Sequence, residues 1–334
     1  MKSSYIYLLL LLVLANCTST KEIQDKNEDN STTYANTITT EELKENLYIL
    51  ASDDYEGRNT GEKGQKKAAE FLKKQYQEYG VSSPISEEDY FQEIPETFLP
   101  NNVNASENVV AFIKGAEFPN EIIVISAHYD HLGTNGEEIF NGADDDASGT
   151  VAVLEIAEAF QKAADNGDGP KRSLLFMNLT AEEKGLYGSK WYVKNPLFPI
   201  NNHVTNLNID MVGRVDKIHQ NNPNYIYLIG SDKLSRELHF LSEEINTKYV
   251  QLELDYKYND ENDPNRFYYR SDHYNFAKNN IPIIFYFNGV HEDYHKATDT
   301  AEKINYELLE KRTKLVFHTA WELANRETKV SVDN

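Results

Sequence analysis

Cysteine is almost absent from this sequence. Cys17 is the only cysteine among 334 residues, so no disulfide can form within the chain and the fold must be stabilised by its core. Basic side chains are also scarce, with 33 lysines and arginines against 54 aspartates and glutamates, which gives a formal net charge of −21. Such a chain would repel a phosphate backbone, which argues against nucleic acid as a partner.

A long hydrophobic run is lacking at the start of the chain. The apolar stretch 5–15 falls short of the about 20 residues that a membrane-spanning helix needs, and it is typical of a secretory signal. Cys17 follows Leu14-Ala15-Asn16, where a bacterial lipoprotein is cleaved and lipidated, although Asn16 departs from the usual small residue. We therefore expect residues 1–16 to be a lipoprotein signal peptide. The protein would be exported and anchored through a lipid on Cys17, on the periplasmic face or the cell surface. A plain signal peptide with a coincidental cysteine is the alternative.

The remaining chain divides into a polar segment and one domain. Residues 17–39 are rich in polar side chains and predict a disordered tether, whereas 40–328 predict a single domain. Strands are expected at 108–113, 122–126, 174–179, 204–211, 225–229 and 283–287. Helices are expected from Thr40 and at 65–79, 148–164, 186–193, 233–247 and 301–324. This alternation predicts an α/β fold with three layers, α/β/α, around a mixed, mostly parallel sheet.

Acidic and histidine motifs stand where predicted strands end, and ligands collect at the carboxyl ends of strands in such folds. The motif residues are His128, Asp130, Glu182, Glu183, Asp210 and His295. Asp130 stands two residues after His128, where its carboxylate can orient the imidazole. Of the glutamate pair, one could bind a metal ion and the other could accept a proton from bound water.

Three adjacent aspartates, Asp144 to Asp146, precede the helix expected at 148–164. One aspartate there could stabilise the positive end of the helix dipole. Three like charges repel one another unless a cation is present, so a carboxylate that bridges two zinc ions explains them better. Asp210 ends an apolar strand, where a charge needs a partner. A polar loop histidine such as His295 would be unremarkable without the other motifs.

Six segments in this order resemble the co-catalytic zinc aminopeptidase family, which includes secreted bacterial aminopeptidases and aminopeptidase Y. The resemblance runs from about Thr40 to Asn325. The segments are His128-Tyr129-Asp130, Gly142 to Gly149, Ala181 to Gly185, Asn208 to Gly213, Arg270-Ser271-Asp272-His273 and Tyr294-His295.

The resemblance implies two zinc ions as cofactors. His128, Asp145 and Asp210 would bind one ion, and Asp145 would bridge to a second that Glu183 and His295 complete. Asp145 is assigned as the bridge because the family places that aspartate three residues after the motif glycine, here Gly142. The family usually has a cis peptide after it.

The resemblance also implies the catalytic roles. Glu182 would be the general base, which deprotonates the zinc-activated water and protonates the leaving amine. Tyr294 would steady the oxyanion, and Arg270 could contact the substrate. His273 and His291 stand near enough in sequence to be pocket residues.

The resemblance implies peptides with a free N-terminus as substrates. We expect the protein to be a monomer. The same fold also serves carboxypeptidases, dipeptidases and glutaminyl cyclases, so these stay open. Cyclases work with one zinc ion, and the full set of five ligands favours a two-zinc hydrolase. A carboxypeptidase needs a basic group for the substrate carboxylate, and Arg270 is a candidate. A non-catalytic binding domain should have lost ligands or the base, which this chain retains.

Overall fold

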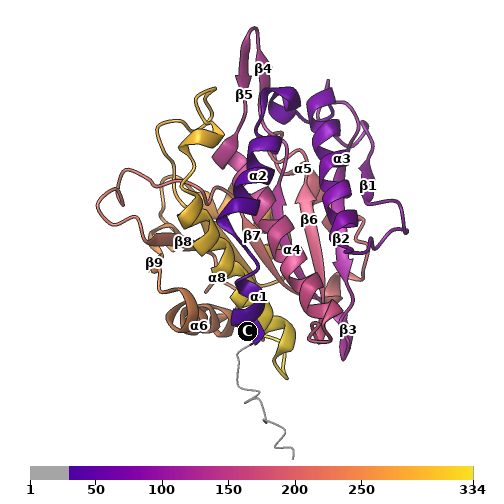
Figure 1. Ribbon diagram of the computed structural model, residues 1–334, viewed down its shortest axis with the longest axis vertical. Helices are drawn as coiled ribbons and strands as arrows, with labels where there is room; N and C mark the ends of the chain where they lie inside the picture. Colours follow the sequence, from indigo (N-terminus) through magenta and orange to yellow (C-terminus); the bar gives the residue numbers. More distant parts are fainter. Residues whose placement is uncertain (1–29, 334) are drawn as a thin grey trace, which may run out of the picture.

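The computed structural model describes residues 30–333 (Figure 1). The expected signal peptide and Cys17 lie outside the described residues. The helices are α1 (Asn30–Ala35), α2 (Thr40–Leu50), α3 (Lys63–Glu78), α4 (Gly149–Asp165), α5 (Tyr187–Lys194), α6 (Arg236–Ile245), α7 (His273–Ala277) and α8 (Tyr306–Asn325). The strands are β1 (Phe91–Ile94), β2 (Ser106–Ile113), β3 (Phe118–His128), β4 (Gly133–Asn135), β5 (Glu138–Phe140), β6 (Arg172–Leu179), β7 (His203–Ile209), β8 (Tyr225–Ile229), β9 (Glu253–Asp255) and β10 (Ile283–Phe287).

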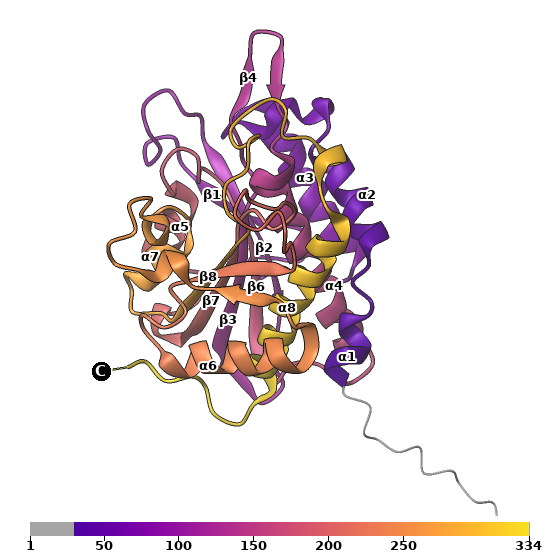
Figure 2. The ribbon, with the colours of Figure 1, turned by 90° about the vertical axis from the view of Figure 1, so that its left-hand side faces the viewer.

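Eight strands form one sheet in the order β1-β2-β6-β3-β7-β10-β8-β9. The four central strands, β6, β3, β7 and β10, run parallel to one another, and β9 is parallel to β8. The three other pairings are antiparallel. Strands β4 and β5 form a separate hairpin that projects from the domain (Figure 2). The expected mixed, mostly parallel sheet is therefore confirmed.

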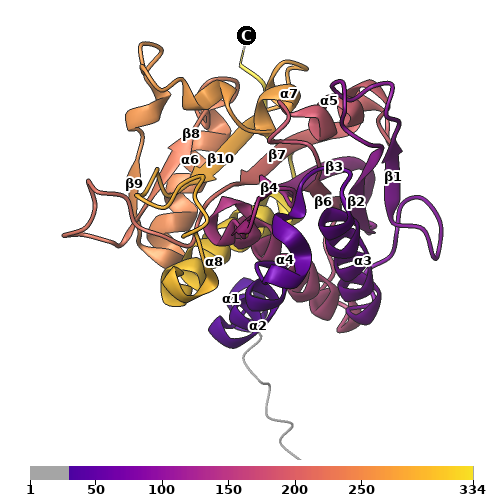
Figure 3. The same ribbon diagram turned by 90° about the horizontal axis from the view of Figure 1, so that it is seen from above.

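Helices cover both faces of this sheet, because its central strands are apolar on both sides. Along β3, Ile123 and Ile125 pack toward α2, α4 and α8, whereas Ile122 and Val124 pack toward α5 and α7. Every residue of β6 is buried, as expected for a strand between two helical layers. Figures 2 and 3 show the larger helical layer, which includes α3 and α4, on one side and the smaller layer of α5 and α7 on the other.

The prediction of a disordered tether is wrong for its last part. Residues 30–35 form α1, which packs against α4 and α8. Tyr34 is buried, its ring stacks on Trp321 with centroids 5.6 Å apart, and its hydroxyl donates to Asp168 Oδ2 at 2.8 Å. The polar composition of this segment concealed one aromatic anchor that provides enough apolar contact to fix a single helical turn.

Other differences lie at the sheet edges and in loops. Strands β1 and β9 were not predicted, because an edge strand of three or four residues with half-exposed side chains leaves little apolar pattern. The helix expected at 301–324 is interrupted, because a 3₁₀ turn at Ala301–Lys303 precedes α8. Asn305 caps the first turn of α8, and its side chain accepts a hydrogen bond from the backbone N–H of Leu308. Within residues 30–333, no helix combines the length and the apolar character needed to cross a membrane.

Candidate metal centre

The carboxyl ends of the four central parallel strands bring the predicted ligands together. Each comes from a different segment: His128 ends β3, Glu183 follows β6, Asp210 follows β7, His295 lies in the loop after β10, and Asp145 lies in the helical turn Ala143–Ser148 before α4. Parallel neighbours end at the same edge of a sheet, so segments far apart in sequence meet there.

One half of the centre contains His128, Asp145 and Asp210. His128 Nε2 lies 3.3 Å from Asp145 Oδ1 and 3.7 Å from Asp210 Oδ1. The other ring nitrogen, Nδ1, lies 3.1 Å from the carbonyl oxygen of Asp130 and can donate to it. That hydrogen bond fixes the proton on Nδ1 and leaves the lone pair of Nε2 directed toward the carboxylates, as a metal ligand requires.

The other half contains Asp145, Glu183 and His295. His295 Nε2 lies 3.1 Å from Asp145 Oδ2 and 3.4 Å from Glu183 Oε1. Asp145 therefore presents one oxygen to each half, which is the geometry expected of a bridging carboxylate. The peptide bond between Asp145 and Asp146 is cis, as the resemblance implied.

Several buried polar atoms at this centre lack a hydrogen-bond partner among the described residues. They include Asp145 Oδ2, Glu183 Oε1 and both ring nitrogens of His131. Leaving such atoms unpaired is costly, and a cation between them would satisfy the two carboxylate oxygens and His131 Nδ1 at once. Imidazole nitrogen with carboxylate oxygen is a donor set that suits zinc. The residues present thus fit a bound zinc ion.

Histidine and carboxylate charges offset each other in the second half. Burial lowers the pKa of His295, but the carboxylates of Asp145 and Glu183 beside its ring outweigh this effect and raise that pKa to about 10. Burial raises the pKa of Glu183, and the nearby imidazoles of His131 and His295 outweigh it and bring that pKa to about 2. The carboxylates therefore favour a positive charge at this position.

Glu182 lies beside the ligands in the same pocket. Burial raises the pKa of Glu182 well above its ordinary value, and the neighbouring carboxylates of Glu183 and Asp210 add to this. A carboxylate that binds a proton more readily than usual can take a proton from water and return it to a leaving group. This placement supports the predicted general base.

Asp130 has a different contact from the one predicted. Its carboxylate is 3.8 Å from His128 Nδ1, too far for a hydrogen bond, and the imidazole is oriented by the main-chain carbonyl of Asp130 instead. The carboxylate accepts from the backbone N–H of Glu182 at 3.1 Å and from the Thr60 hydroxyl at 2.6 Å. Asp130 therefore fixes the position of Glu182 as well as that of His128.

The two aspartates beside Asp145 stabilise the backbone around it. Asp146 accepts from the backbone N–H groups of His128, Gly149 and Met211, at 3.3, 2.9 and 3.0 Å. It thereby ties the ends of β3 and β7 to the start of α4. A run of three aspartates does not by itself separate this role from metal binding.

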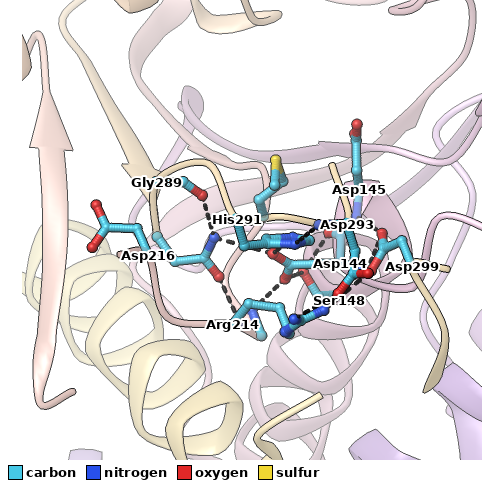
Figure 4. Close-up of polar contacts among 12 residues, drawn as sticks. Asp144, Asp145, Ser148, Arg214, Asp216, Gly289, His291, Asp293 and Asp299 are labelled. Atoms are coloured by element: carbon cyan, nitrogen blue, oxygen red, sulfur yellow. Dashed lines mark hydrogen bonds and ion pairs between the residues drawn. The ribbon is translucent and has the colours of Figure 1, made fainter. Parts of the chain in front are cut away.

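Asp144 lies in a buried polar network behind the centre (Figure 4). It accepts from the Ser148 hydroxyl at 3.1 Å, and its second oxygen lies 3.1 Å from His291 Nε2. Asp299 accepts from the backbone N–H groups of Asp144 and Asp145, at 3.0 and 3.2 Å. The loop that carries His295 is thus bonded to the segment that carries the bridging carboxylate.

A pocket opens beside the metal ligands. Its apolar lining consists of Met211, Phe267, Phe285, Phe287 and Val290. The predicted Tyr294 and Arg270 also line it. The Tyr294 ring stacks on His295 with centroids 3.9 Å apart, and Arg270 Nη2 donates to the Tyr294 hydroxyl oxygen at 3.3 Å. Arg270 is exposed, so its guanidinium stands at the rim.

The two further histidines do not line the pocket. His273 is buried and its Nε2 donates to the carbonyl of Tyr268 at 2.8 Å. His291 belongs to the network of Asp144.

Residues 108–320, more than half of the chain, match the model of Peptidase family M28. The chain belongs to this family. Among curated relatives, leupeptin-inactivating enzyme 1 of Streptomyces exfoliatus is 29% identical over 258 residues, which cover 77% of this chain and 50% of that protein. A probable zinc metalloprotease of Pyrenophora teres is 31% identical over 162 residues, 46% of this chain and 32% of that protein. The M28 chain spans half or less of the length of these relatives.

Solved structures share the fold of this M28 chain. The LapA aminopeptidase of Legionella pneumophila superposes with a TM-score of 0.69 at 21% identity, over 90% of this chain and 76% of that one. An aminopeptidase from Aneurinibacillus gives 0.67 at 17%, over 91% and 98%. A glutaminyl cyclase of Bacteroides thetaiotaomicron gives 0.65 at 16%, over 85% and 98%. The expected three-layer fold is that of the family.

Sequence reasoning missed three residues of this M28 site. Arg58 is buried, and its guanidinium donates to the carbonyls of Tyr129 and Gly142, at 2.8 and 3.0 Å, so it connects the two ligand-bearing loops. Asp299 holds the backbone of Asp145. His131 enters the second half of the centre. Only His131 had a visible signal, since it directly follows the His128-Tyr129-Asp130 motif.

Proposed function

We propose that this M28 chain is a two-zinc aminopeptidase that removes N-terminal residues from peptides. The observation that carries the proposal is the Asp145 carboxylate, which directs one oxygen to each of two ligand sets beside Glu182. Two zinc ions held there would lower the pKa of a bound water and polarise the scissile carbonyl.

The chain's own residues supply the proton transfers and the positioning. Glu182, whose backbone N–H donates to Asp130, would accept a proton from the attacking water and return it to the leaving amine. The Tyr294 hydroxyl lines the same pocket and would donate to the oxyanion. No side-chain nucleophile is needed, so a covalent intermediate is not expected.

The pocket supports cleavage at the amino end of the substrate. Its apolar wall beside the metal ligands fits the side chain of one terminal residue, and the carboxylates of Asp210 and Glu182 provide a negative surface for a free ammonium group. We therefore expect a preference for apolar N-terminal residues over charged ones.

Hydrolysis of aminoacyl p-nitroanilides, free and N-blocked, tests the proposal. We expect chelator-sensitive cleavage of the free-amine substrates alone, with leucine and phenylalanine faster than lysine and glutamate. Glu182→Gln should lower kcat by about 10²–10⁴-fold while the zinc content stays unchanged. Cleavage of N-blocked substrates, or no cleavage by a protein that holds two zinc ions, would contradict the proposal.

Arg270 favours a second candidate, because a guanidinium at the pocket rim can bind a carboxylate. A carboxypeptidase or dipeptidase would use it for the C-terminus of the substrate. A comparison of dipeptides with their C-terminal amides would test this. The second candidate predicts that wild type has a much lower kcat/KM for the amides, and that Arg270→Gln no longer distinguishes the two substrates. Conversion of N-terminal glutamine to pyroglutamate would indicate a cyclase instead.

We further propose that the protein is exported and anchored through a lipid on Cys17, on the evidence of its position after an apolar run. Cys17→Ser should move the enzyme from the membrane fraction to the soluble fraction of expressing bacteria. The same distribution for both forms would contradict the anchor.

A further inference from the structure

His131 is a buried histidine that reaches the second half of the metal centre. It has no exposed surface, and its backbone N–H donates to the carbonyl of Arg58 at 3.1 Å. Its ring Nδ1 lies 3.0 Å from Glu183 Oε1 and 3.9 Å from Asp145 Oδ2. The ring also lies edge-on to that of His295, with centroids 5.9 Å apart.

The contact between His131 and Glu183 is short, but it is not a hydrogen bond. At 3.0 Å the distance is suitable, yet neither Nδ1 nor Glu183 Oε1 has a hydrogen-bond partner among the described residues, so the N–H direction does not meet the oxygen. Ligand atoms that each lie about 2 Å from a shared zinc ion stand roughly 3 Å apart and point at the ion rather than at each other. The Nδ1–Oε1 pair has this separation.

The local backbone makes room for the imidazole. A Cβ at position 142 would come within 2.6 Å of ring atoms Cγ and Cδ2 of His131, so only glycine leaves space for the ring there. Gly142 also has φ of +52°, a left-handed conformation that glycine adopts without strain. The turn that presents Asp145 is therefore shaped to accept the side chain of His131 as well.

We propose that His131 is a fourth protein ligand of the metal ion bound by Asp145, Glu183 and His295, through Nδ1. The inference rests on the two-zinc centre of the proposed function. The two halves would then be unequal, because four protein ligands close this half while the half of His128 and Asp210 keeps more open positions. Water and substrate would enter mainly from the side of His128.

X-ray absorption spectroscopy of the wild-type, untagged protein at two zinc ions per chain tests the ligand directly. Three histidine ligands shared by two ions give an average of about 1.5 imidazoles per zinc, and two give about 1. A value of about 1.5 supports His131 as a ligand. A value of about 1 overturns it, and is the value expected if His131 only positions Glu183.

A variant pair provides the second measurement. In His131→Asn, we expect the dissociation constant of one zinc ion to rise by more than about 100-fold, beyond the 10–100-fold that loss of an outer partner typically causes. His219→Asn is the matched control, because His219 is also buried and faces two carboxylates, Asp216 and Asp255, but no predicted ligand. Zinc competition with a chelator gives both constants, and the control should retain wild-type values.

The outcomes separate this inference from the proposed function. A wild-type protein that binds fewer than two zinc ions contradicts the two-zinc centre itself. Two zinc ions at about 1 imidazole each, with His131→Asn unchanged in affinity, leave the proposed function standing and overturn the role of His131. If His131→Asn does not fold, the imidazole count of the wild type still decides.

Discussion

At the scale of single residues, chemically identical side chains differ by what donates to them. Asp145 and Asp146 are adjacent and both buried, yet three backbone N–H groups donate to Asp146, while Asp145 Oδ2 has no donor among residues 30–333. The Asp146 carboxylate is therefore committed to the fold, and the Asp145 carboxylate is available to a cation. Such a division is invisible in a run of three aspartates.

This difference predicts opposite effects of two isosteric substitutions. Asp145→Asn should abolish binding of both zinc ions and change the stability of the metal-free protein little. Asp146→Asn would place an amide against an N–H donor and should cost the metal-free protein about 1–3 kcal/mol of unfolding free energy. Urea unfolding of the two metal-free variants, with zinc content measured separately, checks this. Equal losses of stability would show that the two carboxylates share one role.

Glu155 provides a residue-scale test that is independent of the metal centre. It is buried in α4, Asn46 donates to its Oε1 at 3.0 Å, and its Oε2 has no donor among the described residues. Burial, together with the nearby carboxylates of Glu42 and Glu158, raises the pKa of Glu155 from 4.5 to about 8. The folded protein thus holds a proton that the unfolded chain releases, so this group lowers stability as the pH rises from about 4.5 to 8.

Glu155→Gln should remove that loss, since glutamine has a similar shape and does not ionise. Relative to wild type, we expect the metal-free variant to gain about 2–4 kcal/mol above pH 8 and little at pH 4.5. Urea unfolding at both pH values measures the difference. Glu158→Gln is the control: it removes one of the two neighbouring charges, from a partly exposed side chain that Lys162 already pairs, and leaves Glu155 buried, so it should recover only part of this gain. A gain at pH 4.5 as large as at pH 8 would refute the assignment.

At the scale of elements, buried strands and long helices were predictable, and short elements were not. Apolar runs marked β3, β6 and β10, because strands buried on both faces are mostly apolar. In α1, by contrast, six residues with one aromatic side chain carry no periodic pattern. What fixes α1 is contact with α4 and α8, which lie more than 100 residues away in sequence.

The attachment of α1 through Tyr34 can be tested directly. Tyr34→Ala removes the stacking on Trp321 and the hydrogen bond to Asp168, and should cost about 3–5 kcal/mol of unfolding free energy. Catalysis at low temperature should persist, because α1 lies at the opposite end of the domain from β4, the strand that directly follows the His128 motif (Figure 2). Thr33→Ala, on the exposed side of α1, is the matched control and should change stability little. Equal stability of the two variants in chemical denaturation would mean that α1 is not attached in solution.

At the scale of the whole molecule, the site is made by the sheet order. The motifs around His128, Glu183, Asp210 and His295 span more than 160 residues, and their convergence follows from the parallel order of β6, β3, β7 and β10. The order of motifs along the chain therefore sufficed to predict that these residues meet at one place. Arg58 and Asp299 could not be predicted, because their role is to hold backbone groups of distant loops, which leaves no motif in the sequence.

The same convergence predicts that the stability of the whole domain depends on bound metal. Asp145, Glu183 and Asp210 meet at one edge of the sheet within a chain of net charge −21, so removing the cations leaves these carboxylates unbalanced. Zinc at about 1,000 times its dissociation constant would stabilise the folded state by about 4 kcal/mol. For a domain of this size, that corresponds to a fall in Tm on the order of 10 °C when a chelator is added. Calorimetry with and without chelator measures the fall, and added zinc should reverse it. The Asp145→Asn variant should unfold at the same temperature in both buffers, because it has no bridging carboxylate. If the Tm of that variant falls as much as that of wild type, the chelator acts elsewhere.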